Sequence, residues 1–245
     1  SLPLLTPMSE VAGRMSAQVA ASLLQKNAGG AGILLGGVPG TPPARVLVIG
    51  GGVSGAAAAE IALGMRASVT ILDKSLPRLR DLDARFGGQV RTLASSTDAL
   101  EREVTAADVV IGAVLIPGAA APKLISRAQL KLMKPGSVLV DVAIDQGGCF
   151  ETSKATTHQH PIYEVDGIIH YCVANMPGAV ARTSTLALGN ATMPFMLALA
   201  DKGWQRACAE DAHLLAGLNV HAGKLTYAAV GEALGLPVTD PKSLL

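Results

Sequence analysis

The sequence predicts an α/β fold built on a doubly wound parallel sheet, because short apolar runs alternate with helical segments over residues 45–173. The spacing of Gly50, Gly52 and Gly55, directly after the apolar run 45–49, is the second observation. The third is that 49% of the 245 residues are hydrophobic, which is ample for a large buried core. Ligands of such sheets bind at the carboxyl ends of the strands.

The glycine turn is expected to lead into a helix over the alanine-rich residues 53–65. Glycine suits this place because bare N–H groups and the positive end of a helix hold a pyrophosphate, and a Cβ atom would intrude. Residues 68–72 then predict a second strand that ends in Asp73, whose carboxylate would accept ribose hydroxyl groups. Strand, turn, helix, strand and acid together predict a Rossmann-type dinucleotide site. Asp73 favours NAD over NADP by repelling a 2′-phosphate, although Lys74 follows it.

A long amphipathic helix is predicted before the sheet, over residues 7–26, with Thr6 as its cap and Pro7 in its first position. Its apolar residues recur four apart, at Val11, Met15, Val19 and Leu23. The glycine- and proline-rich residues 29–43 are interpreted as a connection to the first strand.

The chain beyond Asp73 continues the alternation of strands and helices. Helical spacing or caps predict helices over residues 75–86, 98–105 and 126–133, and apolar runs predict strands over residues 89–93, 108–112, 137–141 and 168–173. The loop 113–122 is a candidate cofactor lid. From Thr183 onward the pattern is helical, with a kink expected at Pro194 and with no strands. We therefore expect residues 1–180 to form the dinucleotide-binding domain and residues 181–245 to form C-terminal helices.

Composition restricts the class of partner. The formal net charge is +1 with acids and bases interspersed, which gives no electrostatic sign of nucleic acid or a membrane surface. The three cysteines lie far apart without metal-ligand spacing, so neither a disulfide framework nor a metal site is predicted. The chain has no apolar run long enough to span a bilayer and no basic start typical of a signal peptide. Small-molecule partners and a reducing cytoplasm are expected.

Asp145 is the candidate catalytic residue, because it follows a predicted strand and precedes the flexible turn Gly147-Gly148. The alternative is an ordinary turn or helix-capping aspartate, which spacing alone favours. The five histidines are scattered and are interpreted as non-ligands. Asn175 and Met176 follow another strand, where they could touch a nicotinamide ring; core packing of Met176 is the alternative.

Five stretches of the sequence, residues 2–16, 36–40, 111–124, 140–151 and 174–180, resemble L-alanine dehydrogenase. The resemblance covers nearly the whole chain and corresponds to the NAD-binding domain and C-terminal helices of that family. It implies reversible oxidative deamination of L-alanine to pyruvate and ammonia, with hydride transfer to NAD. The related transhydrogenase α subunit is less similar in these stretches. A homo-oligomer, commonly a hexamer, is implied as well.

The resemblance also assigns site residues. Asp145 matches the catalytic aspartate of the family, which assists water addition and ammonia release. The cofactor contacts that it implies are Ser9, Gly50, Gly52, Val53, Gly55, Asp73, Arg78, Ser95, Val114, Leu115, Ile144, Asn175 and Met176. No metal ligand is implied.

The chain departs from the family pattern in three respects. Arg66 stands where relatives usually have glycine, and Ala181 replaces a usual proline. The substrate-domain front of the family, which supplies an arginine, a lysine and a histidine to the substrate, would precede Ser1. We therefore expect this chain alone to bind NAD but to turn over poorly. Two alternatives remain open: a non-catalytic NAD-binding module, and the nucleotide-binding part of a proton-translocating transhydrogenase.

Overall fold

The structure is a computed structural model in which residues 3–114 and 121–245 are described. Contacts between Cα atoms divide the chain into two compact units, Ser1–Thr185 and Leu186–Leu245. The division falls inside helix α6 (Ala181–Lys202), close to the boundary predicted at residue 180. The roles assigned to the two parts from the sequence stay predictions.

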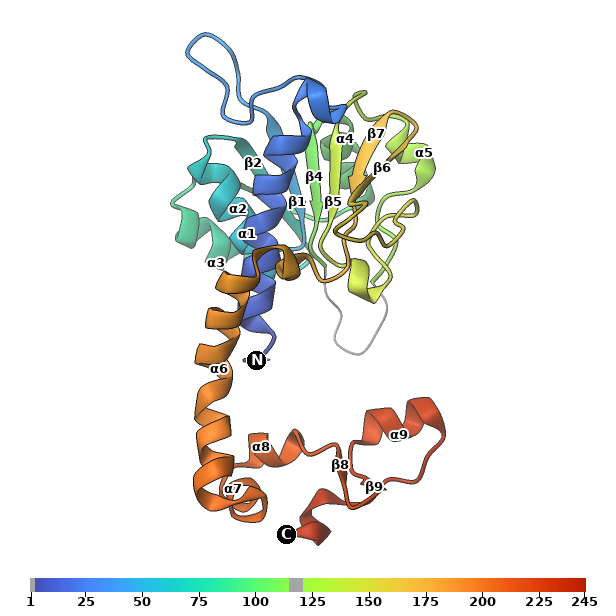
Figure 1. The fold of residues 1–245 in the computed structure, drawn as a ribbon. Coiled ribbons are helices and arrows are strands. Elements are labelled where there is room, and N and C mark those ends of the chain that lie inside the picture. Colours follow the sequence, from blue (N-terminus) through green and yellow to red (C-terminus); the bar gives the residue numbers. More distant parts are fainter. Residues whose placement is uncertain (1–2, 115–120) are drawn as a thin grey trace. The chain divides into compact units, whose positions relative to one another are not determined.

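The first unit is organised around a seven-stranded sheet with the strand order β3-β2-β1-β4-β5-β7-β6 (Figure 1). Neighbouring strands are parallel except β6, which pairs antiparallel with β7. The chain reverses its direction of winding between β1 and β4, where Ile49 pairs with Leu72 on one side and Gly112 on the other. The strands are β1 (Arg45–Ile49), β2 (Ser68–Asp73), β3 (Arg91–Ala94), β4 (Val109–Gly112), β5 (Val138–Asp141), β6 (Ile162–Val165) and β7 (Ile168–Tyr171).

The central strands are buried on both faces, as their uninterrupted apolar runs predict. Alternate residues of β1 contribute to two separate cores, with Val46 and Val48 on one face and Leu47 and Ile49 on the other. Helices cover both faces (Figure 1), which confirms the predicted doubly wound α/β fold. The helices of this unit are α1 (Thr6–Leu23), α2 (Val53–Gly64), α3 (Leu76–Phe86), α4 (Thr97–Ala106) and α5 (Arg127–Leu130), with 3-10 turns η1 (Lys26–Ala28), η2 (Ile144–Gln146) and η3 (Met176–Val180).

Helix α1 packs directly on α2, and the two helices approach closely because small residues face each other. A Cβ atom at Gly13 would lie 2.1 Å from the carbonyl oxygen of Ser54. The apolar stripe of α1 is buried in the same core as α2, with Val19 only partly covered. This contact brings the first turn of α1 to the glycine turn.

Three expectations about local structure were wrong. Thr6 is the first residue of α1 and not its cap; Leu5 holds that position and caps with no side-chain hydrogen bond. The edge strand β6 was not expected, and neither was the two-stranded hairpin of β8 (Val220–His221) and β9 (Lys224–Leu225) in the second unit. By contrast, the helical run expected to end near Gly203 is α6, which contains Pro194 and ends at Lys202, and the kink expected at Pro194 stays a prediction.

The second unit contains the remainder of α6, the hairpin and several short helices. These are α7 (Trp204–Glu210), α8 (Ala212–Ala216), α9 (Ala228–Leu234) and the 3-10 turn η4 (Pro241–Leu244). The Trp204 and His221 rings lie 4.2 Å apart between centroids. Many large apolar side chains of this unit are exposed: Leu186, Leu188, Met193, Met196, Leu197, Leu199, Val220, Tyr227, Val230, Leu234, Leu236, Val238 and Leu245.

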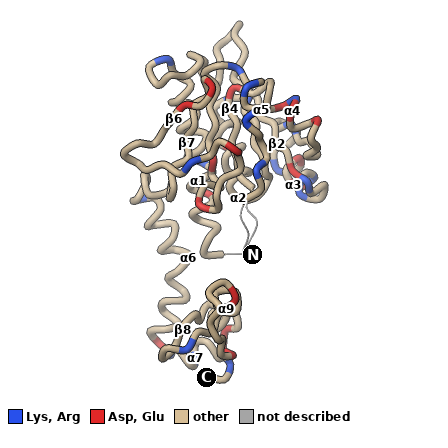
Figure 2. The backbone as a smooth tube through the Cα atoms, turned by 90° about the vertical axis from the view of Figure 1, so that its right-hand side faces the viewer, with Lys and Arg blue, Asp and Glu red and all other residues tan. Residues whose placement is uncertain are grey.

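Basic and acidic residues are interspersed along the backbone of the described first unit (Figure 2). None of the described helices combines the length and apolar character needed to cross a bilayer. The described histidines, cysteines and acids form no cluster of three that could hold a metal ion. Two pockets are lined by residues of the first unit.

Candidate functional site

The turn after β1 is shaped by three glycines, each for a different steric reason. Gly50 has a φ of +97°, and a Cβ atom there would lie 2.8 Å from the carbonyl oxygen of Ala113. At Gly55 a Cβ atom would lie 1.8 Å from the carbonyl oxygen of Gly50, so only glycine lets α2 approach the turn. A Cβ atom at Gly52 would meet no described atom within 4 Å. The described part of the chain therefore leaves space beside Gly52.

That space faces the beginning of α2. Gly52 is the N-cap of this helix, and no side chain accepts a hydrogen bond from its first turn. Free N–H groups and the positive end of a helix dipole attract an anion. The open position at Gly52 lets such an anion approach the backbone, which is the geometry of a pyrophosphate site.

Asp73 and Arg78 both bind Gly51, the middle residue of the turn, one at its N–H group and the other at its carbonyl group. Asp73 accepts hydrogen bonds from the N–H groups of Gly51, at 2.7 Å, and Ser75, at 2.8 Å. The Arg78 side chain donates from Nε to the carbonyl oxygen of Gly51 at 2.6 Å. Two carboxylate oxygens offer about four acceptor positions, so Asp73 keeps capacity for ribose hydroxyl groups.

A pocket of about 760 Å³ opens at the carboxyl ends of β1, β2 and β4, next to this turn. It includes seven residues predicted as cofactor contacts: Ser9, Gly50, Gly52, Val53, Asp73, Ser95 and Val114. Ser9 belongs to α1, and it reaches the rim of the pocket because α1 packs on α2. The pocket lies at the point where the winding of the sheet reverses, the usual ligand site of this architecture.

A second group of predicted residues lies where β5 and β7 end. These strands are neighbours, with Val140 paired to Tyr171. Asp145, on the turn η2, is exposed and accepts a hydrogen bond of 3.3 Å from the backbone N–H of Asn175. Ile144 and Met176 are buried beside them, at 7% and 3% exposure.

The segment that carries Asp145 is held by a buried carboxylate. Asp141, the last residue of β5, is fully buried and accepts hydrogen bonds from the N–H groups of Ala143, at 3.1 Å, and Cys149, at 2.8 Å. The Ser153 hydroxyl also donates to Asp141. Burial raises the pKa of Asp141 above its ordinary value, while these hydrogen bonds oppose the rise. The two ends of the Asp145 segment are thus tied to one strand.

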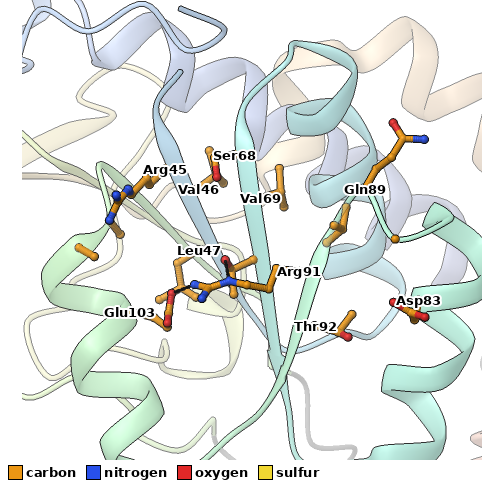
Figure 3. A pocket seen from close by; sticks show the side chains of 15 residues that line it. Arg45, Val46, Leu47, Ser68, Val69, Asp83, Gln89, Arg91, Thr92 and Glu103 are labelled. Atoms are coloured by element: carbon orange, nitrogen blue, oxygen red, sulfur yellow. Dashed lines mark hydrogen bonds and ion pairs between the residues drawn. The ribbon is translucent and has the colours of Figure 1, made fainter. Parts of the chain in front are cut away.

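A second groove, of about 650 Å³, lies over the amino-terminal ends of β1, β2 and β3. Arg91 reaches toward Glu103 there, while Gln89 points away from both (Figure 3). Arg91 pairs with Glu103 and donates to the Thr70 hydroxyl at 3.1 Å, so its charge is already matched by the protein. This groove lies at the end of the strands opposite to the glycine turn, and we do not assign it to the cofactor.

The comparisons with known proteins identify the family. The family model described as alanine dehydrogenase/PNT, C-terminal domain, matches residues 16–228. The chain belongs to this family. Alanine dehydrogenase of Halomonas elongata is 68% identical over 244 residues, and that of Mycobacterium tuberculosis strain H37Rv is 56% identical over 245 residues. Each alignment covers 100% of this chain and 66% of the relative, so the chain spans just under two thirds of their length.

Solved structures of the alanine dehydrogenase/PNT family agree with this assignment. A structure of L-alanine dehydrogenase has a TM-score of 0.94 at 49% identity, covering 96% of this chain and 65% of that one. A transhydrogenase from Sinorhizobium meliloti has a TM-score of 0.67 at 27% identity, covering 78% of this chain and 55% of the other. The predicted family resemblance and the Rossmann-type fold are both confirmed, and the family agrees with the predicted use of NAD.

The structure places the remaining predicted residues in different ways. Gly55 lies beneath the turn, Arg78 contacts Gly51, and Asp145, Ile144, Asn175 and Met176 lie at the ends of β5 and β7, outside the residues that line the pocket. Leu115 and most of the candidate lid 113–122 fall outside the described residues. The functional roles of all these residues stay predictions.

Sequence reasoning missed several residues that line the pocket: Leu5, Thr6, Lys74, Pro122 and Leu124. Leu5 and Thr6 lie one helical turn before Ser9, so an α-helical projection from Ser9 would have found them. Lys74 follows Asp73 directly. Pro122 is the last residue of the candidate lid and Leu124 follows it, and no signal in the sequence picked out either of them.

Proposed function

We propose that this chain forms the NAD site of an alanine dehydrogenase, an enzyme that oxidises L-alanine to pyruvate and ammonia and catalyses the reverse reaction. The observation that carries the proposal is the open position at Gly52, beside the uncapped first turn of α2. Membership of the alanine dehydrogenase/PNT family supplies the reaction.

The residues at the end of β1 fit a dinucleotide. The N–H groups at the start of α2 would hold its pyrophosphate, and Asp73 would accept hydrogen bonds from the adenosine ribose. The carboxylate disfavours a 2′-phosphate at the same place, which supports NAD as the cofactor. When bound, NAD supplies the hydride acceptor of the reaction.

Asp145 is proposed as the acid and base. Its carboxylate is exposed at the end of β5, where it would receive and return protons as water adds to the substrate carbon and ammonia leaves. The N–H of Asn175 fixes one carboxylate oxygen, Oδ1. The second oxygen, Oδ2, is directed to no described donor, so it remains the one available to a substrate.

The proposal extends to the substrate-binding segment and to the oligomer of the whole protein. The chain spans 66% of its alanine dehydrogenase relatives, and we propose that the whole protein supplies the substrate-binding arginine, lysine and histidine that the family resemblance implies. The exposed apolar side chains of the second unit support packing of residues 181–245 on such a segment. We propose a homo-oligomer, with a hexamer as the family expectation, acting in the cytoplasm.

NADH formation from NAD and L-alanine at alkaline pH tests the proposal, with wild type and Asp145→Asn side by side and NADH binding followed by fluorescence. We expect both forms of this chain to bind NADH and to turn over poorly on their own, whereas in the whole protein the wild type should oxidise alanine and Asp145→Asn should not. NADH binding without turnover by the wild-type whole protein would favour the non-catalytic module. Hydride transfer to NADP without an amino acid would favour a transhydrogenase. Absence of NADH binding by the wild type would refute the cofactor site itself.

A further inference from the structure

We propose that His158 is a positioning residue for this reaction, because its ring fixes the Asn175–Met176 turn in place against Asp145. The inference rests on the proposed function and adds to it a residue outside the pocket. His158 belongs to the segment between η2 and β6, and sequence reasoning treated it only as a non-ligand.

The contact is a hydrogen bond of 3.1 Å between His158 Nε2 and the carbonyl oxygen of Asn175. A carbonyl oxygen can only accept, so the proton of the ring must lie on Nε2 for this bond to form. The segment that carries His158 is itself tied to the end of β7. Thr156 donates its N–H to Cys172 at 2.9 Å and accepts from the N–H of Ala174 at 3.2 Å.

Asn175 adopts a left-handed backbone conformation, with a φ of +53°. Asparagine takes this conformation more readily than other residues with a Cβ atom but less readily than glycine, so hydrogen bonds to its carbonyl group add to the stability of the turn. The Asn175 carbonyl accepts a second hydrogen bond, from the N–H of Gly178 at 2.9 Å. His158 thus supplies one of two donors that hold the carbonyl in place.

The His158 ring and the Asn175 amide lie near each other at Gly178, although all three residues are exposed. A Cβ atom at Gly178 would lie 3.3 Å from Nε2 of His158 and 3.2 Å from Nδ2 of Asn175. The Ser184 hydroxyl donates to the carbonyl of Pro177 at 2.8 Å and anchors the far side of the turn.

Asn175 connects His158 with the proposed acid and base. Its N–H donates to Asp145, and its carbonyl accepts from His158, so rotation of this one residue would disturb both bonds. The same backbone conformation directs the following Met176 side chain into the core, where it is 3% exposed. Loss of the His158 donor is therefore expected to act at the nicotinamide end of the cofactor and on the orientation of Asp145, and not at the glycine turn.

Binding of two probes separates these ends. NADH reaches both, whereas ADP-ribose lacks the nicotinamide ring. One lost hydrogen bond of about 1 kcal/mol corresponds to an about fivefold weaker affinity, which we expect for NADH with His158→Ala. The affinity of the same variant for ADP-ribose should not change. His158→Gln keeps an amide nitrogen the same number of bonds from Cα and should restore NADH binding.

The matched control is His160→Ala, which removes a neighbouring exposed histidine whose ring forms no hydrogen bond or ion pair with the described residues. It should leave both affinities unchanged. Equal weakening of NADH and ADP-ribose by His158→Ala, or an unchanged NADH affinity, would overturn the proposal. In turnover by the whole protein, His158→Ala should lower kcat, and His158→Gln should recover it.

Hydrogen exchange of the unliganded protein tests the contact without any cofactor. The amides of residues 175–178 should exchange faster in His158→Ala than in wild type, while the amides of residues 50–56 stay unchanged. Unchanged exchange at residues 175–178 would refute the positioning role. If the wild type bound neither NADH nor ADP-ribose, the proposed function would fail, and the exchange result would still decide whether His158 holds the turn.

Discussion

The ends of β1 and β7 both place a residue in the left-handed region of backbone conformation, Gly50 with a φ of +97° and Asn175 with a φ of +53°. At the β1 end the conformation is possible because side chains are absent, and neighbouring carbonyl groups leave no room for one. At the β7 end an asparagine is held by hydrogen bonds from His158 and Gly178. A backbone held by close contacts tolerates almost no side chain in place of glycine. A backbone held by several hydrogen bonds loses only part of its stabilisation when one of them is removed.

Gly55→Ala should give the largest effect, because its Cβ atom would lie 1.8 Å from a backbone oxygen of the β1 turn. We expect a loss of about 3 kcal/mol in the free energy of unfolding and loss of detectable NADH binding. Urea denaturation and NADH fluorescence measure these two quantities. A stable variant that binds NADH would show that the β1 turn can shift, and the contrast between the two ends would disappear.

Gly52→Ala should separate binding from folding at the same turn. The new methyl group would meet no atom of the described residues within 4 Å but would occupy the space proposed for pyrophosphate. We expect the free energy of unfolding to change by less than about 1 kcal/mol and NADH to bind at least about tenfold more weakly. Gly64→Ala is the control, since its Cβ atom also meets nothing within 4 Å but lies at the far end of α2. Unchanged NADH affinity of Gly52→Ala would argue against pyrophosphate at this place.

Elements with local sequence signals could be predicted, and elements that depend on pairing with distant segments could not. The β1–α2–β2 unit could be predicted because its glycines, apolar runs and final Asp73 are all local signals. Strand β6 could not, because Ile162–Val165 alternates between exposed and partly buried residues and gains its structure from pairing with β7. The β8–β9 hairpin has only two residues in each strand, too few for an alternating pattern.

The candidate site divides in the same way. Contacts at the glycine turn follow from local spacing, and the pocket includes them. The bond between Asp145 and Asn175 depends on β5 and β7 being neighbours, although β6 lies between them in the sequence. The role of His158 depends on a loop returning to the end of β7, which leaves no periodic signal.

His170 makes the β7 end sensitive to pH, and no histidine lies at the β1 end. This residue of β7 is fully buried, stacks on Tyr163 with centroids 4.9 Å apart, and accepts a hydrogen bond from Thr152 at 2.8 Å through Nε2 while Nδ1–H donates to the carbonyl of Ile168. Burial lowers the pKa of His170 below its ordinary value, with the Ile168 bond opposing the shift. Its contribution to stability is therefore present above the unfolded pKa, about 6.5, and is lost as pH falls toward the folded pKa.

Urea denaturation of wild type and His170→Gln at about pH 7.5 and about pH 5.5 tests this sign. The variant should be less stable than wild type at the higher pH, and the gap should narrow by about 1 kcal/mol at the lower pH. A gap that stays constant or widens on acidification would mean that His170 does not titrate as a buried neutral ring. NADH should likewise bind more weakly to His170→Gln than to wild type at about pH 7.5, and this difference in affinity should be smaller at about pH 5.5.

Arg66→Gly should give the smallest effect. Arg66 follows α2 with a φ of +66°, the conformation in which helices commonly end on glycine. Unlike Asn175, Arg66 is not one of the proposed cofactor contacts. Relief of backbone strain should therefore raise the free energy of unfolding by about 0.5–1 kcal/mol and leave NADH binding unchanged. Thermal denaturation measures the gain. A destabilised variant would mean that the arginine side chain contributes more than its backbone costs.

The packing of α1 on α2 has a consequence for how the chain reaches its fold. Helix α1 leaves the ribosome before the residues of α2 and of the central strands, yet its apolar stripe is buried only against them. During synthesis α1 therefore exposes Val11, Met15 and Leu23 until the first βαβ unit has emerged. A fragment that starts at β1 would leave the opposite surface uncovered in turn. Within this chain, burial of α1 therefore depends on the βαβ unit that follows it.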